Sequence, residues 1–287
     1  MPAASPAPSY DTITIVGVGL IGASIGLAIR ERKLAAHVVG VGRTKKTLDK
    51  AKVLGAVDEV TTSLARGVKQ AQLTIFCTPV EQIAAQVLAA AAHVPVGALM
   101  TDAGSTKEAI VAAVGGQLPR SVQFIGSHPL AGSEKNGPAH ARADLLVGRV
   151  VVVTPSKASP PAAVAAIQNF WQQLGARVVT MTPPDHDAAL AATSHAPHAI
   201  ASALAAATPP EFANLVAGGW LDTTRIAAGD AELWRQILLS NRDHSLRALG
   251  KFAKVLSQLR RALKDRDGEA LRRILEAGKQ TRDAVGS

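Results

Sequence analysis

The chain has 287 residues and a formal net charge of +9, with 47% hydrophobic and 18% charged residues. This composition predicts a globular fold of one large or two medium domains and excludes a disordered chain. Aromatic residues make up only 3% and do not alternate with Lys and Arg, so nucleic-acid binding is not expected, and an anionic substrate and cofactor explain the charge more simply. The single cysteine excludes an internal disulfide framework and predicts a reducing compartment, the cytoplasm.

The start of the chain is small and rich in proline. It lacks the charged and apolar regions of a signal peptide, so we expect residues 1–10 to be a disordered tail. No apolar run in the chain is long enough, without polar interruptions, to cross a membrane.

A strand, a glycine-rich turn and a helix follow this tail. The apolar residues Ile13–Val16 lead into Gly17–Gly22 (GVGLIG), and a helix-compatible run spans Ala23–Arg32. In this setting the GxGxxG pattern indicates dinucleotide binding. Gly17 permits the tight turn, Gly19 lets a pyrophosphate approach the backbone, and Gly22 lets the helix pack on the strand. Free N–H groups at the helix N-terminus bind the phosphates. The expected cofactor contacts here are Gly17, Gly19, Leu20, Ile21 and Gly22.

Short apolar strands alternate with amphipathic helical runs through the first two-thirds of the chain. This alternation predicts an α/β fold with a Rossmann-like, doubly wound sheet rich in parallel strands. The expected strands are residues 12–16, 37–41, 73–77, 98–101, 123–126, 150–154 and 177–181.

The strands stop at Thr182-Pro183-Pro184, and the pattern is helical from there on. Because the proline pair marks a boundary, we predict a dinucleotide-binding domain over residues 11–183 and an all-helical dimerisation domain over residues 184–287. An apolar stripe from Leu233 to Leu263 predicts one long core helix over residues 232–264, of a kind suited to exchange between two subunits.

The second strand ends without the acidic residue that commonly binds the ribose 2′-hydroxyl of NAD. The expected position is Gly42, and Arg43, Thr44, Lys45 and Lys46 follow it. No carboxylate would repel a 2′-phosphate there, and Arg43 could pair with it. The sequence therefore favours NADP, with Gly42, Arg43 and Thr44 as candidate contacts. NAD stays open, because Arg43 and the lysines could simply begin an exposed helix.

Four further motifs follow in chain order. Asp102–Lys107 (DAGSTK) and Gly126–Glu134 (GSHPLAGSE) follow predicted strands, where open α/β sheets bind ligands. Ser194–His198 (SHAPH) and Thr224–Ala227 (TRIA) lie in the helical half. In order and spacing these motifs resemble those of the prephenate/arogenate dehydrogenase family of tyrosine biosynthesis, and the resemblance covers nearly the whole chain.

The resemblance implies a nucleotide-binding domain, a helical domain that forms a homodimer, and oxidative decarboxylation of prephenate to 4-hydroxyphenylpyruvate with hydride transfer to NADP or NAD. His128 matches the catalytic histidine, since a neutral imidazole is needed to accept or polarise the proton of the substrate hydroxyl. Ser105 is similar to a family serine that hydrogen-bonds this histidine and the substrate hydroxyl, and we also expect it beside the cofactor. It could equally be the N-cap of the next helix.

The family's substrate is a dianion, so fixed cations are expected around it. Arg225 matches the arginine that binds a substrate carboxylate, for which its planar fork is suited. His198 matches a position near the side-chain carboxylate. Glu134 and Lys135 stand where the family has a pair that gates the pocket.

The resemblance also implies supporting residues. Asp187 and Ser194 are expected to order the helix that bears His198, and Ser194 also to contact the substrate. His195 is expected to be structural, and Trp234 to lie in the core or the dimer interface or, alternatively, to line the site.

A Cys-Thr-Pro sequence at the end of a predicted strand is also shared with the family. In Cys77-Thr78-Pro79 we expect Thr78 to lie close to the cofactor and Cys77 to be a small buried residue, not a nucleophile. No cluster of His, Cys and Asp has the spacing of metal ligands, so no metal is expected.

Alternatives stay open at this point. Prephenate carries a keto group where arogenate carries an ammonium. A protonated His198 would repel the ammonium, whereas an acid such as Asp230 near Arg225 would attract it. A β-hydroxyacid dehydrogenase would share the architecture but leave the HPLAG sequence unexplained. A non-catalytic NADP-binding redox sensor would keep the glycines without needing His128.

Overall fold

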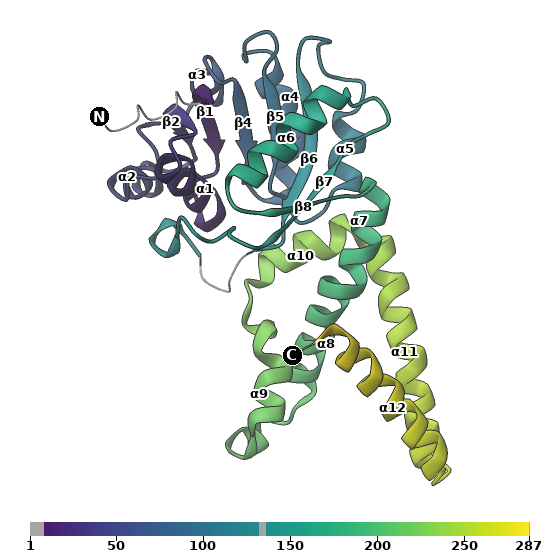
Figure 1. The fold of residues 1–287 in the computed structure, drawn as a ribbon. Coiled ribbons are helices and arrows are strands. Elements are labelled where there is room, and N and C mark those ends of the chain that lie inside the picture. The colour runs from purple at the N-terminus through teal and green to yellow at the C-terminus, as the bar shows by residue number, and fades with distance from the viewer. Residues whose placement is uncertain (1–8, 132–135, 287) are drawn as a thin grey trace, which may run out of the picture.

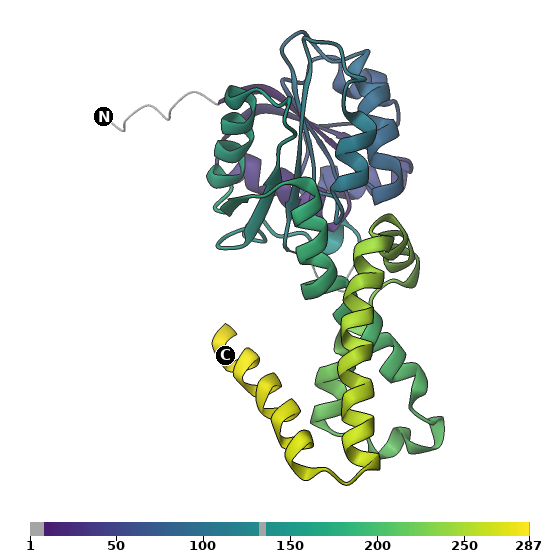
Figure 2. The same cartoon turned by 90° about the vertical axis from the view of Figure 1, so that its right-hand side faces the viewer.

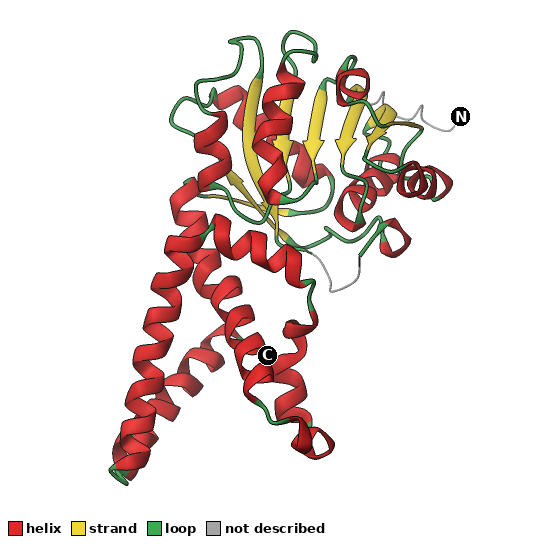
Figure 3. Cartoon of the chain, turned by 180° about the vertical axis from the view of Figure 1, so that it is seen from behind, coloured by secondary structure: helices red, strands yellow, loops and turns green. Residues whose placement is uncertain are grey.

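The computed structural model describes residues 9–131 and 136–286. It consists of an N-terminal α/β domain and a helical domain that extends from one edge of the sheet (Figure 1). The strands at the centre of the sheet point toward the helical domain (Figure 3). Their carboxyl ends, where open sheets bind ligands, therefore lie at the junction of the two domains.

The described residues form one eight-stranded sheet in the order β3-β2-β1-β4-β5-β6-β7-β8. Strands from β3 to β6 pair in parallel, β7 is antiparallel to β6, and β8 is parallel to β7. The order reverses between β1 and β4, which confirms the doubly wound prediction and places a crevice at that point. The strands are β1 (Tyr10–Val16), β2 (Ala35–Val41), β3 (Glu59–Thr61), β4 (Leu73–Phe76), β5 (Leu99–Asp102), β6 (Gln123–Pro129), β7 (Val150–Thr154) and β8 (Arg177–Thr180).

Helices cover both faces of this sheet (Figure 2). Each face has its own hydrophobic core. One core joins the sheet to α1, α2 and α6, with Ile25 and Trp171 among its buried side chains. The other joins it to α3, α4 and α5 through residues such as Ile83 and Ile110. The bounds are α1 (Leu20–Glu31), α2 (Lys45–Val53), α3 (Leu64–Val68), α4 (Val80–Ala91), α5 (Glu108–Val114), η1 (Pro138–His140) and α6 (Pro161–Gln173).

The helical domain begins directly after β8. A five-residue π-helical segment, η2, continues α7 into α8, and short 3-10 helices flank α9. The elements are α7 (Pro183–Leu190), η2 (Ala191–His195), α8 (Ala196–Ala207), η3 (Pro210–Leu215), α9 (Gly218–Thr224), η4 (Arg225–Ala228), α10 (Ala231–Ser240), α11 (Arg242–Lys264) and α12 (Gly268–Val285). None of the helices in the described part of the chain is both long and apolar enough to cross a membrane.

Two expectations about the strands are corrected. β6 does not end at Gly126 but continues to Pro129, so His128 lies within the strand and opposite Val152 of β7. The extension exists because β7 supplies an antiparallel partner, which local periodicity does not reveal. The short strand β3 was not expected from the sequence; it pairs with β2 at the edge of the sheet.

The prediction of a single helix over residues 232–264 is also wrong. The helix breaks at Asn241, whose φ of −111° and ψ of 37° are not helical. The side-chain amide of this buried residue donates to the carbonyl oxygen of Asp187 and lies 3.0 Å from Nδ1 of His195. These contacts turn the chain, so that α10 lies across the end of the sheet and α11 runs away from it (Figure 1).

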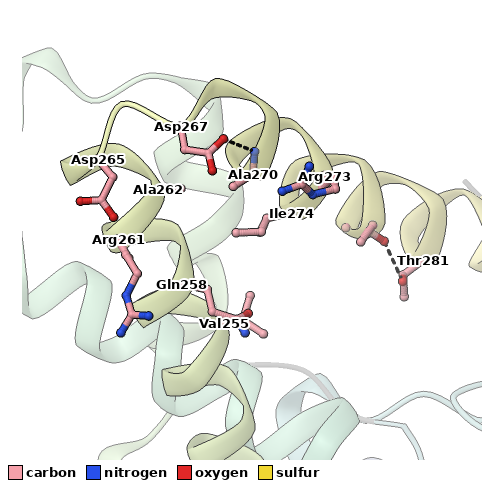
Figure 4. Close-up of a pocket in the computed structure, with 12 residues that line it drawn as sticks. Val255, Gln258, Arg261, Ala262, Asp265, Asp267, Ala270, Arg273, Ile274 and Thr281 are labelled. Carbon is pink, nitrogen blue, oxygen red and sulfur yellow. Dashed lines mark hydrogen bonds between the residues drawn. The ribbon is translucent and has the colours of Figure 1, made fainter.

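The apolar stripe of α11 is not a core of this chain, contrary to the expectation. Leu246, Phe252, Leu256 and Leu263 are 54%, 41%, 43% and 56% exposed. An open groove of about 830 Å³ separates α11 from α12, lined by Val255 and by Ile274 among others (Figure 4). Exposed apolar surface of this kind marks an interaction site.

Candidate functional site

The glycine-rich turn lies in the crevice between β1 and β4. Gly17 has a φ of +95°, a conformation that glycine adopts without strain, and a Cβ there would lie 2.7 Å from the carbonyl oxygen of Cys77. A Cβ on Gly22 would overlap the carbonyl oxygen of Gly17. Gly17 thus packs against the residue after β4, and Gly22 packs against the turn itself, so neither position has room for a side chain.

The start of α1 fits an anion. Gly19 is the N-cap, and no side chain caps the first turn. No heavy atom of the described chain lies within 4 Å of the position that a Cβ on Gly19 would take. The first-turn amides, including those of Leu20 and Ile21, thus border open space, as dinucleotide phosphates require. These residues fit the predicted cofactor.

The connection from β2 to α2 contains the residues predicted to meet the adenosine ribose. Arg43 and Thr44 are exposed, and Gly42 packs against Leu48, to which a Cβ on Gly42 would approach within 3.2 Å.

The residues after β4 lie at the other side of the crevice. There Thr78 donates to Oε1 of Gln86 at 2.6 Å. Burial raises the pKa of the Cys77 thiol, and the Asp102 charge adds to this effect, as expected of an unreactive cysteine.

The Asp102–Lys107 segment is organised by a buried ion pair. Nζ of Lys107 contacts the carboxylate of Asp102, and both side chains are fully buried. The same carboxylate accepts from the amides of Gly104 and Ser127, at 2.9 and 3.0 Å. Burial lowers the pKa of Lys107, whereas the contact with Asp102 opposes that shift. Asp102 thus ties the turn after β5 to β6, next to His128.

His128 is surrounded by groups that keep it neutral. Its Nδ1 lies 2.9 Å from Nε2 of His186, and Nδ1 of His186 lies 2.7 Å from a carboxylate oxygen of Asp187. Burial lowers the pKa of His128 well below its ordinary value of 6.5, and the nearby His186, Lys107 and His195 lower it further. A buried imidazole that stays unprotonated at neutral pH can accept a proton.

The hypothesis that Ser105 caps the next helix is wrong. The N-cap of α5 is Lys107, and the amides of Lys107 and Glu108 donate to the Asp187 carboxylate at 2.8 and 3.0 Å. A carboxylate is a stronger acceptor for these amides than a hydroxyl, but it comes from α7 in the other domain. Ser105 is half-buried, and among the described residues it makes no hydrogen bond to His128, whose Nδ1 bonds to His186 instead.

Of the substrate residues expected in the helical domain, His198 lies against Trp234. The rings of His198 and Trp234 stack, with centroids 3.5 Å apart and planes at 13°. Burial lowers the pKa of His198, and its Nδ1 has no partner among the described residues. Arg225 is exposed at the start of η4, which packs against α8. The loop after η4 approaches the stack, since a Cβ on Gly229 would lie 2.8 Å from Nε1 of Trp234.

Other predicted residues take different places. Glu134 and Lys135 lie outside the described residues. Ser194 is half-buried in η2, whereas Asp187 ties α7 to α5 and so anchors the start of the helical domain. His195 is buried against Asn241 and edge-on to Trp234. In the described part of the chain, no three His, Cys, Asp or Glu residues are grouped as metal ligands.

Sequence reasoning missed two residues beside His128. Lys107 lies within the DAGSTK motif, but a long polar side chain gives no sign of complete burial in the sequence. His186 follows Pro183-Pro184-Asp185, a setting that does not by itself indicate a functional histidine. The adjacent His186-Asp187 pair was the available signal, because a histidine beside a carboxylate is a common way to set a ring's protonation.

The buried histidines predict that the protein loses stability as the pH falls. The pKa of His195 is lowered to about 4, chiefly by burial, and those of His128 and His198 are lowered too. Below the unfolded pKa of about 6.5, the unfolded state binds more protons than the native state, so the free energy of unfolding falls as the pH falls from about 6.5 toward 4. Urea unfolding at several pH values measures this. In His195→Asn, which keeps an acceptor for Asn241, the slope should be shallower; a profile identical to wild type would contradict the assignment.

Comparisons with known proteins agree with this geometry. A model of the prephenate dehydrogenase nucleotide-binding domain matches residues 25–180, and a model of the prephenate dehydrogenase dimerization domain matches residues 182–277. The prephenate dehydrogenase of Bacillus subtilis (strain 168) is 35% identical over 283 residues, which are 96% of this chain and 76% of that protein.

Solved structures show the same arrangement of domains. Prephenate dehydrogenase from A. aeolicus, in complex with hydroxyphenyl propionate and NAD+, has a TM-score of 0.88 and 29% identity, covering 99% of each chain. Synechocystis arogenate dehydrogenase has a TM-score of 0.80 and 30% identity, covering 96% of this chain and 99% of that one. These findings do not support a non-catalytic sensor. Both family models match, and a 35% identical relative spans nearly the whole chain, so this chain belongs to the prephenate dehydrogenase family of NAD(P)-dependent dehydrogenases.

Proposed function

We propose that this chain converts prephenate to 4-hydroxyphenylpyruvate in tyrosine biosynthesis, with NADP as the oxidant and loss of carbon dioxide. The observation that carries the proposal is the buried, neutral imidazole of His128, which lies near the carboxyl end of β6 and is held there by His186 of the helical domain. When bound, the nicotinamide supplies the acceptor for the hydride that leaves C4 of the substrate.

His128 is the base in this proposal. Its Nδ1 is engaged by His186, so Nε2 is the atom that takes the proton of the substrate's 4-hydroxyl. Ser105, in the turn after β5, has no capping bond to make and is available to the same hydroxyl. Arg225 binds a carboxylate of the dianionic substrate through two parallel hydrogen bonds.

Prephenate is favoured over arogenate because Asp230 is engaged as a helix cap and does not offer a free acid to an ammonium. The carboxylate of Asp230, the residue considered for that role, accepts from the amide of Leu233 at 2.9 Å as the N-cap of α10. The expected repulsion of an ammonium by a protonated His198 contributes little at neutral pH, since burial lowers the pKa of His198. The B. subtilis relative is named a prephenate dehydrogenase and the Synechocystis structure an arogenate dehydrogenase, so both substrates belong in the test.

We also infer that two copies pair through the helical domain. The supporting observations are the match of residues 182–277 to a dimerization domain and the exposed apolar side chains along α11. A second copy covering this stripe would remove the exposed leucines from water.

The test of the proposed function is absorbance at 340 nm with prephenate or arogenate, each with NADP or NAD. We expect the fastest turnover with prephenate and NADP. Turnover only with arogenate would correct the substrate, and turnover only with NAD would correct the cofactor. Binding of a dinucleotide without turnover of either substrate would overturn the proposal.

The cofactor preference predicts a selective effect of Arg43→Ala. Loss of a charge-assisted bond worth about 1.5–3 kcal/mol should raise the KM for NADP roughly 10- to 100-fold and leave the KM for NAD unchanged. Steady-state kinetics with both cofactors measure this. Lys52→Ala, in the last turn of α2, is the control. An equal effect on both cofactors would argue against a 2′-phosphate contact.

The substrate role of Arg225 predicts a binding defect. Arg225→Ala should raise the KM for prephenate roughly 10- to 100-fold, with a smaller effect on kcat, because a carboxylate contact is present before and during the reaction. Arg242→Ala, an exposed arginine of α11 paired with Asp243, serves as the matched control. An unchanged KM would remove Arg225 from the site.

A further inference from the structure

Three buried side chains form a continuous hydrogen-bonded chain from the sheet into the helical domain. His128 on β6 contacts His186 on α7 at 2.9 Å, and His186 contacts Asp187 at 2.7 Å. The three residues are 9%, 0% and 1% exposed. Water therefore does not compete for these contacts, and the proton positions must satisfy one another.

The Asp187 carboxylate, at one end of this series of hydrogen bonds, acts as an acceptor. One oxygen of Asp187 accepts from the amide of Lys107 and the other from the amide of Glu108, at 2.8 and 3.0 Å. Burial raises the pKa of Asp187, but the bonds from His186, Glu108 and Lys107 outweigh burial and lower it. An ionised carboxylate only accepts, so Nδ1 of His186 must carry a proton.

The proton on Nδ1 of His186 determines the direction of the hydrogen bond between His186 and His128. In a neutral His186 protonated at Nδ1, Nε2 has a lone pair and accepts, so the bond from His128 requires a proton on Nδ1 of His128. Nε2 of His128 is then left unprotonated. The titratable groups that act on His128 from neighbouring elements are Lys107 before α5 and His195 in η2. Asp102, at the end of β5, is paired with Lys107. The two backbone amides on Asp187 balance its charge in part.

We propose that His186, anchored by Asp187, is a positioning residue that holds His128 in the tautomer with a free Nε2. The proposal rests on the proposed function, in which Nε2 of His128 takes the hydroxyl proton. Once that proton arrives, His128 becomes a cation beside the Lys107 ammonium, and the Asp187 carboxylate stabilises this cation through His186. The logic is that of the Asp-His pair in serine proteases, where the carboxylate sets the tautomer and stabilises the imidazolium.

Two substitutions of His186 separate its two bonds. The terminal atoms of glutamine reach the place of Nε2, so His186→Gln keeps an acceptor for His128. The terminal atoms of asparagine reach only the place of Nδ1, so His186→Asn keeps the bond to Asp187 and leaves Nδ1 of His128 without an acceptor. We expect kcat within about fivefold of wild type in His186→Gln and about 10²-fold lower in His186→Asn. The KM for prephenate and the Kd for NADP should change less than about threefold in both, and surface variant His93→Asn is the control.

Nitrogen-15 NMR of histidine-labelled protein gives a readout that does not depend on turnover or on any His186 variant folding. Comparison with His128→Asn assigns the His128 ring. We expect Nδ1 protonated and Nε2 unprotonated at pH 7.5, and the opposite tautomer in wild type would overturn the proposal. Equal losses of kcat in the two His186 variants, or none in either, would overturn it too. Failure of wild type to turn over prephenate or arogenate would instead defeat the proposed function, while the NMR result would still decide the tautomer.

Discussion

Replacing His128 by asparagine should lower kcat by at least about 10²-fold, because the variant has no group at the place of Nε2 to take the substrate proton. Asparagine carries an N–H near the place of the histidine Nδ1, so it can still donate to His186 and keep β6 and α7 joined. The loss should therefore be one of chemistry, with the affinity for NADP unchanged.

Steady-state kinetics with prephenate and calorimetric titration with NADP measure these two quantities. His93→Asn, a change of the same kind on the surface, should match wild type in both. In the wild type, kcat/KM should fall only below pH 6.5, since the pKa of His128 is well below that value. Turnover of His128→Asn within about threefold of wild type would eliminate His128 as the base.

Replacing Lys107 by methionine should destabilise the protein by about 3–5 kcal/mol, because it leaves the buried Asp102 carboxylate without its cation. Methionine retains most of the aliphatic volume, so the cavity contribution is small. The amides of Gly104 and Ser127 still donate to the carboxylate, which places the expected value toward the lower end of this range.

Urea unfolding followed by circular dichroism measures the change. Lys45→Met is the matched control, since Lys45 pairs with Asp49 on the surface with its side chain 85% exposed, and such pairs contribute about 0–1 kcal/mol. Equal stability of the two variants would show that the Asp102–Lys107 pair makes no net contribution.

Much of the α/β domain could be predicted from local sequence. Strand–turn–helix patterning identified the dinucleotide turn, and the structure shows why: Gly17 and Gly22 have no room for a side chain. Apolar runs located seven of the eight strands. The edge strand β3 was missed because it is three residues long and half-buried, which is too short for a periodic signal.

The errors lie where distant residues decide local structure. The break at Asn241 interrupts an apolar stripe whose period continues on both sides, although the polar run from Ser240 to Ser245 was a usable signal. The first amides of α5 donate to Asp187 and not to Ser105, because a carboxylate 80 residues away along the chain reaches them. His128 and His186 are 58 residues apart, and no spacing rule links them.

Local sequence is enough to predict the alternating α/β pattern, the glycine turn and the side chains that carry the chemistry, because these depend on neighbours within a few residues. How those side chains are protonated and paired depends on the folded arrangement. Burial removes water from His128, Lys107 and Asp187, so each needs a partner within the protein. Lys107 pairs with Asp102 inside the α/β domain, whereas His128 and Asp187 have partners across the domain junction. The exposed apolar stripe of α11 is a similar case. The spacing of its apolar residues predicts an apolar helix face, but it does not indicate which surface packs against that face.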